Sequence, residues 1–210
     1  MNPKVKDAIE WVICIIAAIV LALIIRHFIG TPTIVENKSM YPTLIEGQRL
    51  LINRTIKTFG GTYTRGDIVT LEAPSIGRVS SYNKDEDSPI ATFYKPSSAL
   101  EEFSYYFLEI GKKSYIKRVI ACEGEHLKIE DGKVYINGKL LDEPYLKEGV
   151  VTPQNGVFYD VIVPEGCVFV MGDNREASMD SRSFGCIPVS KIESKVWIRF
   201  WPFDLFGKVD

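Results

Sequence analysis

The chain has 210 residues and a formal net charge of −2, with 25 Lys and Arg side chains against 27 Asp and Glu side chains. Residues 1–30 hold three basic and two acidic side chains, and the remainder holds 22 basic and 25 acidic ones. A mildly acidic main part without a stripe of Lys and Arg argues against nucleic-acid binding, which needs a basic surface. The two histidines, His27 and His126, are too few for an ordinary zinc cluster.

An apolar stretch near the N-terminus is long enough to cross a membrane. Apolar or small residues run without a break from Trp11 to Ile25, and a helix over Ala8–Ile29 would span about 30 Å. We therefore expect residues 1–30 to form an N-terminal end and a transmembrane anchor, followed by one domain over residues 31–210. A cleaved signal peptide is the alternative, but no small-x-small cleavage pattern follows the apolar run.

The charges that flank the apolar stretch predict its orientation. Lys4 and Lys6 precede it, and Arg26 lies at its end. Basic residues favour the cytoplasmic side of a membrane, whereas acidic residues count little. Two basic residues against one place the N-terminus inside the cell membrane and residues 31–210 outside it.

The chain after the anchor is rich in short β-type segments. Asp131-Gly132 lies between two alternating segments and predicts a tight hairpin, and Asn137-Gly138 marks a second turn. We expect a mainly β domain with an antiparallel or mixed sheet. The expected strands are Arg49–Asn53, Asp67–Leu71, Tyr115–Ala121, His126–Glu130, Lys133–Asn137, Phe158–Val163, Val168–Met171 and Val196–Phe200.

Residues 75–113 interrupt this pattern and predict an insertion made of a loop and a helix. Residues 75–98 are polar, with an acidic cluster at residues 85–87, and are expected to form an exposed loop. Ser98 and Glu101 have the spacing of a capping box, and apolar residues recur at helical spacing up to Ile110, so we expect a helix over Ala99–Ile110. Its apolar stripe is expected to pack on the β core; contact with lipid or substrate is the alternative.

The cysteines predict no disulfide scaffold. Cys14, Cys122, Cys167 and Cys186 are few and scattered, and none forms a Cys-x-x-Cys motif. Cys167 and Cys186 could pair with each other, and buried free thiols are the simpler alternative. None of the four lies in a recognisable nucleophile motif.

Ser39 and Lys117 are the residues that suggest nucleophilic catalysis. Ser39 lies in a Ser-Met-x-Pro turn soon after the apolar stretch, and alternation in the Tyr115–Ile120 segment places Lys117 on the same face as Val119. A serine hydroxyl becomes a nucleophile when a base takes its proton, and burial lowers the pKa of a lysine so that its amine can be that base. An ordinary turn serine and a solvated edge-strand lysine are the alternatives.

Other nucleophilic arrangements have less support. A Ser-His-Asp triad would need His27, which lies in the anchor, or His126, which opens a hairpin strand. The chain has no Gly-x-Ser-x-Gly turn, no glycine-rich phosphate loop and no EF-hand.

Three segments follow the anchor in the order Ser39–Leu44, Tyr115–Val119 and Gly172–Arg182, with the shorter segments Arg65–Val69, Val134–Gly138 and Trp201–Phe203 beside them. These segments, in this order and behind an anchor, resemble those of the type I signal peptidases. The members of that family are membrane-bound Ser/Lys endopeptidases that remove secretory signal peptides.

The resemblance implies a role for each matching residue. Ser39 would be the nucleophile and Lys117 the general base. Ser178 would contact the lysine, and the pair formed by Asp180 and Arg182 would support the site.

The chain departs from the family pattern at two places. Asn37 stands two residues before the nucleophile, where many members have a serine or glycine. In members with serine, its hydroxyl joins the oxyanion hole, and the Asn37 amide is a possible substitute donor. The insertion at residues 75–113 is longer than the link expected in compact members.

The resemblance further implies that a signal peptide binds as an extended strand beside the site. Small residues at its −1 and −3 positions would enter shallow apolar pockets, although plain core packing explains each pocket candidate equally well. Aromatic residues near the C-terminus would seat the domain at the membrane or close its core. The pocket candidates are Val35, Met40, Leu44, Tyr115 and Ile116, and the aromatic residues are Phe200, Trp201, Phe203 and Phe206.

We therefore expect a single-pass membrane serine endopeptidase that cleaves signal peptides through an acyl-enzyme, without metal or cofactor. Its expected partners are the signal peptides of preproteins, membrane lipid through the anchor, and the secretion translocon. A related Ser/Lys peptidase, such as a conjugation-associated one or a self-cleaving repressor, is one alternative. The other is a catalytically silent, membrane-tethered β domain that binds secreted or pilus proteins.

Overall fold

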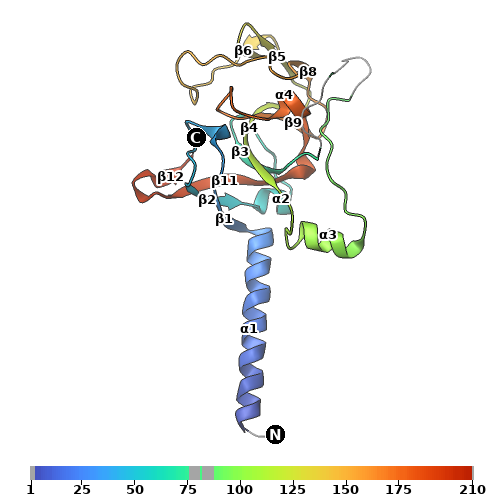
Figure 1. The fold of residues 1–210 in the computed structure, drawn as a ribbon, viewed down its shortest axis with the longest axis vertical. Helices are drawn as coiled ribbons and strands as arrows, with labels where there is room; N and C mark the ends of the chain where they lie inside the picture. The colour runs from blue at the N-terminus through green and yellow to red at the C-terminus, as the bar shows by residue number, and fades with distance from the viewer. Residues whose placement is uncertain (1–2, 76–80, 82–87, 210) are drawn as a thin grey trace.

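The fold consists of one long N-terminal helix and a β-rich domain, seen in a computed structural model that describes residues 3–75, 81 and 88–209. Helix α1 (Pro3–Phe28) extends away from the domain (Figure 1). By length and composition, α1 can cross a membrane, and none of its apolar window is buried against the domain. The mainly β, antiparallel class predicted from the sequence is confirmed.

The larger sheet contains the strands on which the rest of the domain is built. Its neighbouring strands are all antiparallel. In spatial order they are β1 (Gly30–Ile34), β2 (Arg49–Asn53), β11 (Ile192–Trp201), β3 (Ile68–Glu72), β4 (Ser114–Cys122), β9 (Cys167–Met171) and β10 (Ile187–Pro188), and β12 (Gly207–Lys208) pairs with β11.

A smaller sheet lies at the end of the domain farthest from α1 (Figure 1). The predicted hairpin at Asp131-Gly132 is confirmed, and both turn residues have positive φ angles, as a tight two-residue turn requires. The turn at Asn137-Gly138 is confirmed in the same way. The order of the strands is β7 (Lys139–Leu140), β6 (Lys133–Ile136), β5 (His126–Glu130) and β8 (Asp160–Ile162).

Strand β4 is buried on both faces from Lys117 to Ala121, because this part of it separates two hydrophobic clusters. Ile120 packs with residues of the smaller sheet, such as Leu127 and Val161. Val119 belongs to a second cluster with Val69 on the opposite face. Residues that alternate along one strand thus enter different clusters, as the two-residue period of a strand requires. A charged residue in β4 is therefore enclosed by protein.

Strand β8 is shorter than predicted, and β7, β10 and β12 were not predicted. Two further differences, at β1 and β11, have local reasons. Strand β1 was not predicted. It contains Pro32, which an edge strand tolerates, and β1 pairs with β2 alone among the described strands. Strand β11 begins four residues earlier than predicted because its polar residues find partners. Glu193 forms an ion pair with Lys112, and Ser194 hydrogen-bonds Thr70 across 2.6 Å.

Apart from α1 and the helix of the insertion, the helices are short, and none of them was predicted. A helix of one turn buries too few residues to produce a periodic pattern in the sequence. They are the 3₁₀ turns η1 (Lys38–Met40), η2 (Val189–Lys191) and η3 (Phe203–Leu205), with α2 (Thr55–Phe59) and α4 (Ser181–Phe184).

The predicted helix of the insertion is present as α3 (Ala99–Tyr106), with Ser98 accepting a hydrogen bond from the Glu101 N–H at its start. It ends before Ile110 because Glu109 adopts a left-handed conformation, with φ of 61°. The Glu109 carboxylate is held there by ion pairs with two arginines. Most of the loop predicted before this helix, residues 76–80 and 82–87, lies outside the described residues.

The prediction that the apolar stripe of α3 packs on the core is wrong. Leu100 is 80% exposed and Phe103 is 52% exposed, and α3 contains no buried residue. The helix touches the sheet through its tyrosines instead: Tyr105 donates a hydrogen bond to Glu72, and Tyr106 accepts one from Lys191. The stripe therefore faces away from the domain.

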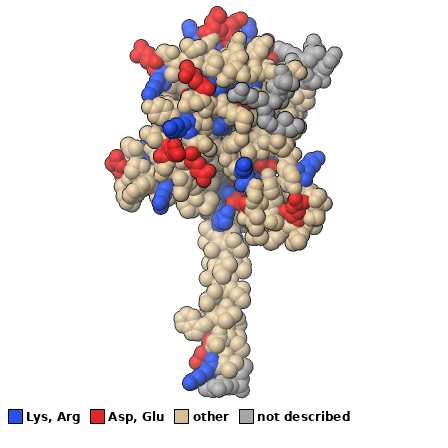
Figure 2. All heavy atoms as spheres, viewed as in Figure 1, with Lys and Arg blue, Asp and Glu red and all other residues tan. Residues whose placement is uncertain are grey.

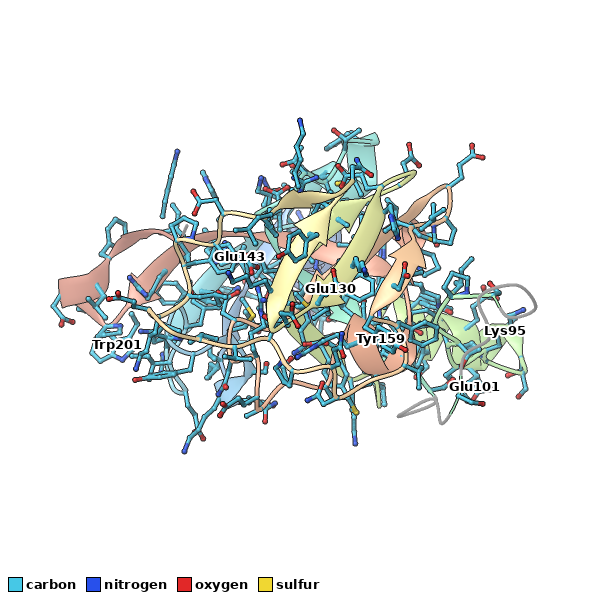
Figure 3. The ribbon with its side chains drawn as sticks, turned by 90° about the horizontal axis from the view of Figure 1, so that it is seen from above. Lys95, Glu101, Glu130, Glu143, Tyr159 and Trp201 are labelled. Atoms are coloured by element: carbon cyan, nitrogen blue, oxygen red, sulfur yellow. The ribbon has the colours of Figure 1, made fainter. Side chains whose placement is uncertain are left out.

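Two alternatives left open by the sequence are settled by burial and bonding. All four cysteines are free thiols, with Cys167 and Cys186 buried. Trp201, Phe203 and Phe206 are exposed, so these three do not close the core. Figure 3 shows Trp201 at one end of the domain and Glu101 of α3 at the opposite end.

We predict that Gly30→Ala weakens the junction between α1 and the sheet. A Cβ at this position would lie 2.3 Å from the backbone oxygen of Ile52, which pairs with β1. The strands would have to separate, and such overpacking costs about 1–3 kcal/mol. The thermal unfolding midpoint of the detergent-solubilised full chain should fall, whereas Thr31→Ala, one residue on, should leave it nearly unchanged. Equal midpoints for wild type and Gly30→Ala would contradict the tight pairing.

Candidate active site

Ser39 lies in a turn that is fixed from both sides. The neighbouring Met40 is buried in a cluster with residues of β2 and β3. On the other side, the backbone N–H of Asn174 donates a 3.0 Å hydrogen bond to the Ser39 carbonyl, and its side-chain amide donates one of 3.1 Å to the Lys38 carbonyl. The segment after β9 thus holds the turn in place.

Gly172 allows this close approach. A Cβ at Gly172 would lie 2.3 Å from the Ser39 carbonyl oxygen and 2.3 Å from Ser178 Oγ. Because any other residue would collide with both serines, glycine is required here for packing. The three residues therefore form one tightly packed contact.

Lys117 reaches Ser39 from β4. Its Nζ lies 2.9 Å from Ser39 Oγ and 3.0 Å from the Ile116 carbonyl oxygen. The lysine is only 3% exposed, and the Tyr115 ring lies near its ammonium, 5.3 Å from Nζ to the ring centroid. The structure therefore brings together the two residues that the sequence singled out, although they are 78 positions apart.

Burial makes the charged form of Lys117 unfavourable and lowers its pKa to about 8. The Arg182 guanidinium also lowers this pKa, while the carboxylates of Asp180 and Asp173 raise it by a smaller amount than burial lowers it. Neither carboxylate forms an ion pair with the lysine, because each is bound to an arginine. The amine is therefore partly neutral near neutral pH.

The pair of Asp180 and Arg182 is fully buried and hydrogen-bonded at both ends. Two bonds of 2.8 Å join the guanidinium and the carboxylate, and the Gly172 N–H donates a third bond of 3.0 Å to Asp180. A bidentate pair of this kind holds both side chains in one orientation. The pair thus ties α4 to the residue that packs against Ser39.

A second buried pair, Arg118 with Asp173, was missed in the sequence. Arg118 Nε and Nη2 donate bonds of 2.9 and 2.8 Å to the Asp173 carboxylate, and Thr43 donates another of 2.6 Å. The Tyr145 ring covers the guanidinium, 3.9 Å from Cζ to the ring centroid. The available signal was an arginine inside an apolar strand, because such a charge needs a buried partner.

Ser178 lies beside the pair of Ser39 and Lys117 but is not bonded to the lysine. Its Oγ is buried and has no hydrogen-bond partner among the described residues. Ser178 Oγ and the Ser39 carbonyl oxygen both border Gly172. The contact with Lys117 that the resemblance implies is therefore not a hydrogen bond in this structure.

A cavity of about 900 Å³ runs past Ser39 and Lys117, between the chain of β1 and the start of β4. Four of the five pocket candidates line it, and so does the exposed Asn37. Leu44 is the exception, since it is fully buried in the core and does not line the cavity. The four candidates are Val35, Met40, Tyr115 and Ile116.

The strand edges beside this cavity are open. Residues Ser114–Lys117 of β4 pair with β3 on one side, whereas β9 joins the other side only from Arg118 onward. Strand β1 pairs with β2 alone among the described strands. Free backbone groups on both sides of a cavity can receive an extended peptide.

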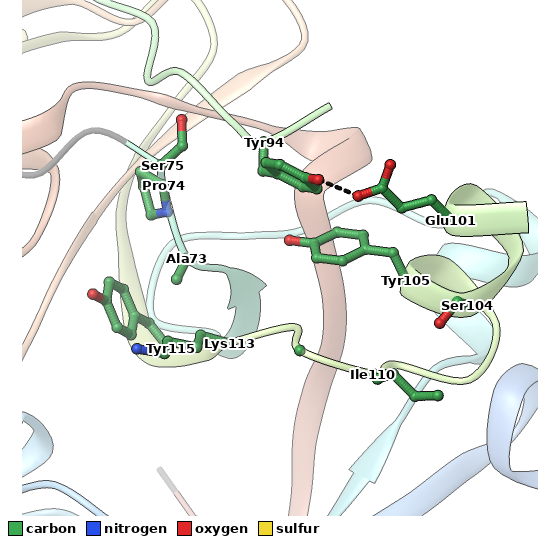
Figure 4. Close-up of a pocket in the computed structure, with 11 residues that line it drawn as sticks. Ala73, Pro74, Ser75, Tyr94, Glu101, Ser104, Tyr105, Ile110, Lys113 and Tyr115 are labelled. Carbon is green, nitrogen blue, oxygen red and sulfur yellow. Dashed lines mark hydrogen bonds between the residues drawn. The ribbon is translucent and has the colours of Figure 1, made fainter. Parts of the chain in front are cut away.

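The insertion adds a second cavity next to the first. It has a volume of about 610 Å³ and lies between α3 and the start of β4, with Lys113 and Tyr115 lining both cavities. Figure 4 shows the Tyr105 ring beside the ring of Tyr94, with 5.3 Å between their centroids, and Tyr94 hydrogen-bonds Glu101. The helix of the insertion thus stands beside the site.

Comparisons with known proteins agree on one family. The profile described as "Signal peptidase, peptidase S26" matches residues 8–201. Signal peptidase I of Bacillus licheniformis is 36% identical, over 99% of this chain and 96% of that protein. Signal peptidase I T of Bacillus subtilis (strain 168) is also 36% identical, over 96% of this chain and 89% of that protein.

Two further comparisons give lower identity. Signal peptidase IB of Staphylococcus aureus (strain COL) is 33% identical, over 96% of this chain and 93% of that protein. A crystal structure of a signal peptidase I from Enterococcus faecalis V583 is 24% identical, covering 64% of this chain and 96% of that one, with a TM-score of 0.40. The match to the family profile and the near full-length relatives are sufficient: this chain belongs to the signal peptidase family, peptidase family S26.

Proposed function

We propose that this chain is a membrane-anchored serine endopeptidase that removes N-terminal signal peptides from secreted preproteins. Membership of the signal peptidase family supports the reaction and favours it over the alternative of a silent binding domain. The observation that carries the mechanism is the 2.9 Å contact between Ser39 Oγ and the Nζ of the buried Lys117. An amine with a lowered pKa next to a hydroxyl is the arrangement that general-base catalysis requires.

The proposed reaction has two stages. Neutral Lys117 takes the proton of Ser39, and Ser39 Oγ attacks the carbonyl carbon of the scissile bond. The resulting ammonium gives its proton to the leaving amine, so the mature protein departs and the signal peptide remains as an ester of Ser39. Lys117, neutral again, then takes a proton from water, whose oxygen attacks the ester carbonyl. The bond to Ser39 breaks, Ser39 Oγ takes the proton back from Lys117, and the signal peptide leaves with a new carboxylate end.

The neighbouring residues would support these steps without exchanging protons. Ser178, whose buried Oγ has no hydrogen-bond partner among the described residues, would be available to orient the amine, and the ion pair of Asp180 and Arg182 would hold the surrounding segment in place. We also propose that the Asn37 amide donates to the oxyanion together with the backbone N–H of Ser39. The exposed position of Asn37 on the wall of the same cavity is compatible with this role.

The substrate is proposed to bind as an extended strand between β1 and β4. The open edges of these strands would supply main-chain hydrogen bonds. Val35, Met40, Tyr115 and Ile116 line the cavity and would form the shallow pockets for small side chains. Because Met40 and Val35 are almost fully buried, core packing holds the walls that they form and would resist their widening for large groups.

We further propose that residues 1–30 form the cytoplasmic end and the membrane anchor, and that residues 31–210 lie outside. The length and apolar composition of α1 support a membrane span. The basic residues Lys4 and Lys6 at its start, against Arg26 at its end, support the orientation. Contact with the secretion translocon would follow from the same location.

Replacing either member of the proposed dyad should abolish cleavage. We expect Ser39→Ala and Lys117→Ala to lower kcat on a preprotein by roughly 10³–10⁶-fold, because the two groups act as a unit. Circular dichroism should show an unchanged fold. Lys113→Ala is a matched control in the same cavity and should retain kcat. Substantial activity of either dyad variant would refute the assignment.

The dependence of cleavage on pH should report the lowered pKa of Lys117. As pH falls through about 8, the amine gains a proton and cannot act as a base. The value of kcat/KM should then fall about tenfold per pH unit. Lys117→Arg should be inactive throughout because a guanidinium does not lose its proton in this range. An acidic limb that lies near the ordinary lysine pKa would argue against a buried base.

The orientation can be measured by protease protection. A protease added outside intact spheroplasts should digest residues 31–210 and spare the first residues of the chain. A cytoplasmic marker protein should stay intact in the same sample. Protection of residues 31–210 until the membrane is opened would show that the domain faces inward.

A further inference from the structure

Helix α3 has two different faces. Tyr105 and Tyr106 contact Glu72 and Lys191 of the domain, as described above. The opposite face carries Leu100 and Phe103, and Phe103 stacks on Phe107 with 5.1 Å between ring centroids. Ile110, just beyond the helix, is 64% exposed. An exposed apolar surface of this kind on an ordered helix usually has a partner.

Helix α3 is attached to the end of the anchor helix. The Glu109 carboxylate accepts a 2.7 Å hydrogen bond from Arg26, near the end of α1, and one of 2.6 Å from Arg54. The rings of His27 and Phe107 are in contact, with 4.9 Å between centroids. Figure 1 shows α3 beside the upper end of α1 and lying across its direction. A membrane crossed by α1 would therefore have its surface beside α3.

We propose that the apolar face formed by Leu100, Phe103 and Ile110 docks on the lipid surface of the membrane that α1 crosses. This proposal rests on the proposed membrane span of α1. A helix that lies in the membrane interface places apolar residues among the lipids and keeps its other face in the polar region. The position of α3 beside the membrane end of α1 favours lipid over a protein partner.

The charges of α3 indicate which kind of lipid contact is involved. The helix contains Glu101 and Glu102 and no Lys or Arg. Docking therefore depends on apolar contact and not on attraction to anionic headgroups. It should occur on phosphatidylcholine and should be insensitive to salt.

Docking of α3 would also fix the height of the catalytic cavity above the membrane. Residues 107–113 join the helix to β4, and residues Lys112–Lys117 line the cavity. Lys112 is anchored to the sheet by its ion pair with Glu193. The helix and the cavity are therefore connected by a short, fixed segment. A substrate that is itself embedded in the membrane would meet Ser39 at a constant distance from the lipid.

Photocrosslinking of the full chain tests the contact directly. We would place benzoylphenylalanine at position 103, irradiate the protein in phosphatidylcholine vesicles, and measure lipid adducts by mass spectrometry. Position 16, in the middle of α1, reports the membrane span. Position 140 is the matched control, because Leu140 is also an exposed apolar residue but lies in the smaller sheet, far from α1.

We expect lipid adducts at positions 16 and 103 and none at position 140, in low and high salt alike. An adduct at 16 without one at 103 would overturn the docking of α3 while leaving the anchor intact. The absence of lipid adducts at positions 16 and 103 would overturn the membrane span and the docking together. A protein adduct in place of lipid at 103, or equal lipid adducts at 103 and 140, would also overturn the proposal.

A kinetic comparison tests the consequence for substrates. The double variant Leu100→Ser with Phe103→Ser should cleave a short soluble peptide at the wild-type rate, because neither residue lines the catalytic cavity. It should cleave a membrane-inserted preprotein several-fold more slowly, and Leu140→Ser should not. If the double variant matches the wild type on both substrates, or loses the same fraction of its rate on both, a role for α3 at the membrane is overturned.

Discussion

The site depends on keeping the amine of Lys117 out of water. A solvated lysine would be almost entirely charged at neutral pH and would be no base for Ser39. The structure excludes water by placing the lysine in β4, which is covered on both faces. Two carboxylates nearby could restore the charge, but Asp173 and Asp180 are each bound by an arginine. The lowered pKa and the two buried ion pairs are therefore parts of one arrangement.

These ion pairs also explain how distant segments are assembled. Asp180 binds the backbone of Gly172, and Asp173 binds Thr43 in the chain just after the Ser39 turn. Asn174, in the same segment as both, holds the turn itself. A buried charge is costly unless it is paired, so these contacts favour a single arrangement of the segments. The ion pairs that keep the two carboxylates away from Lys117 thus also hold Ser39 in position.

Membership of the signal peptidase family and the position of α1 give this arrangement its context. Strand β1 follows α1 almost directly and leads into the Ser39 turn, so the proposed nucleophile is close to the end of the proposed anchor. The insertion adds a second connection on the other side of the cavity, since α3 is tied to α1 and continues into β4. The proposed anchor and the proposed docking of α3 both set the distance between Ser39 and the membrane surface.

The sequence by itself determined the features that depend on neighbours along the chain: the long apolar helix, the hairpin at Asp131-Gly132, the start of α3 at Ser98, and the motifs that contain Ser39 and Lys117. Only the tertiary structure decided which surfaces meet. The stripe of α3 and the partner of Arg118 were mistaken or missed because each depends on which distant segment, if any, covers the residue. Strand β1 was missed because its place at the edge of the sheet is decided by the fold. Periodicity shows that a residue is apolar, and it does not show whether protein or another surface covers it. The lowered pKa of Lys117 likewise required the structure, because burial is a property of the whole fold.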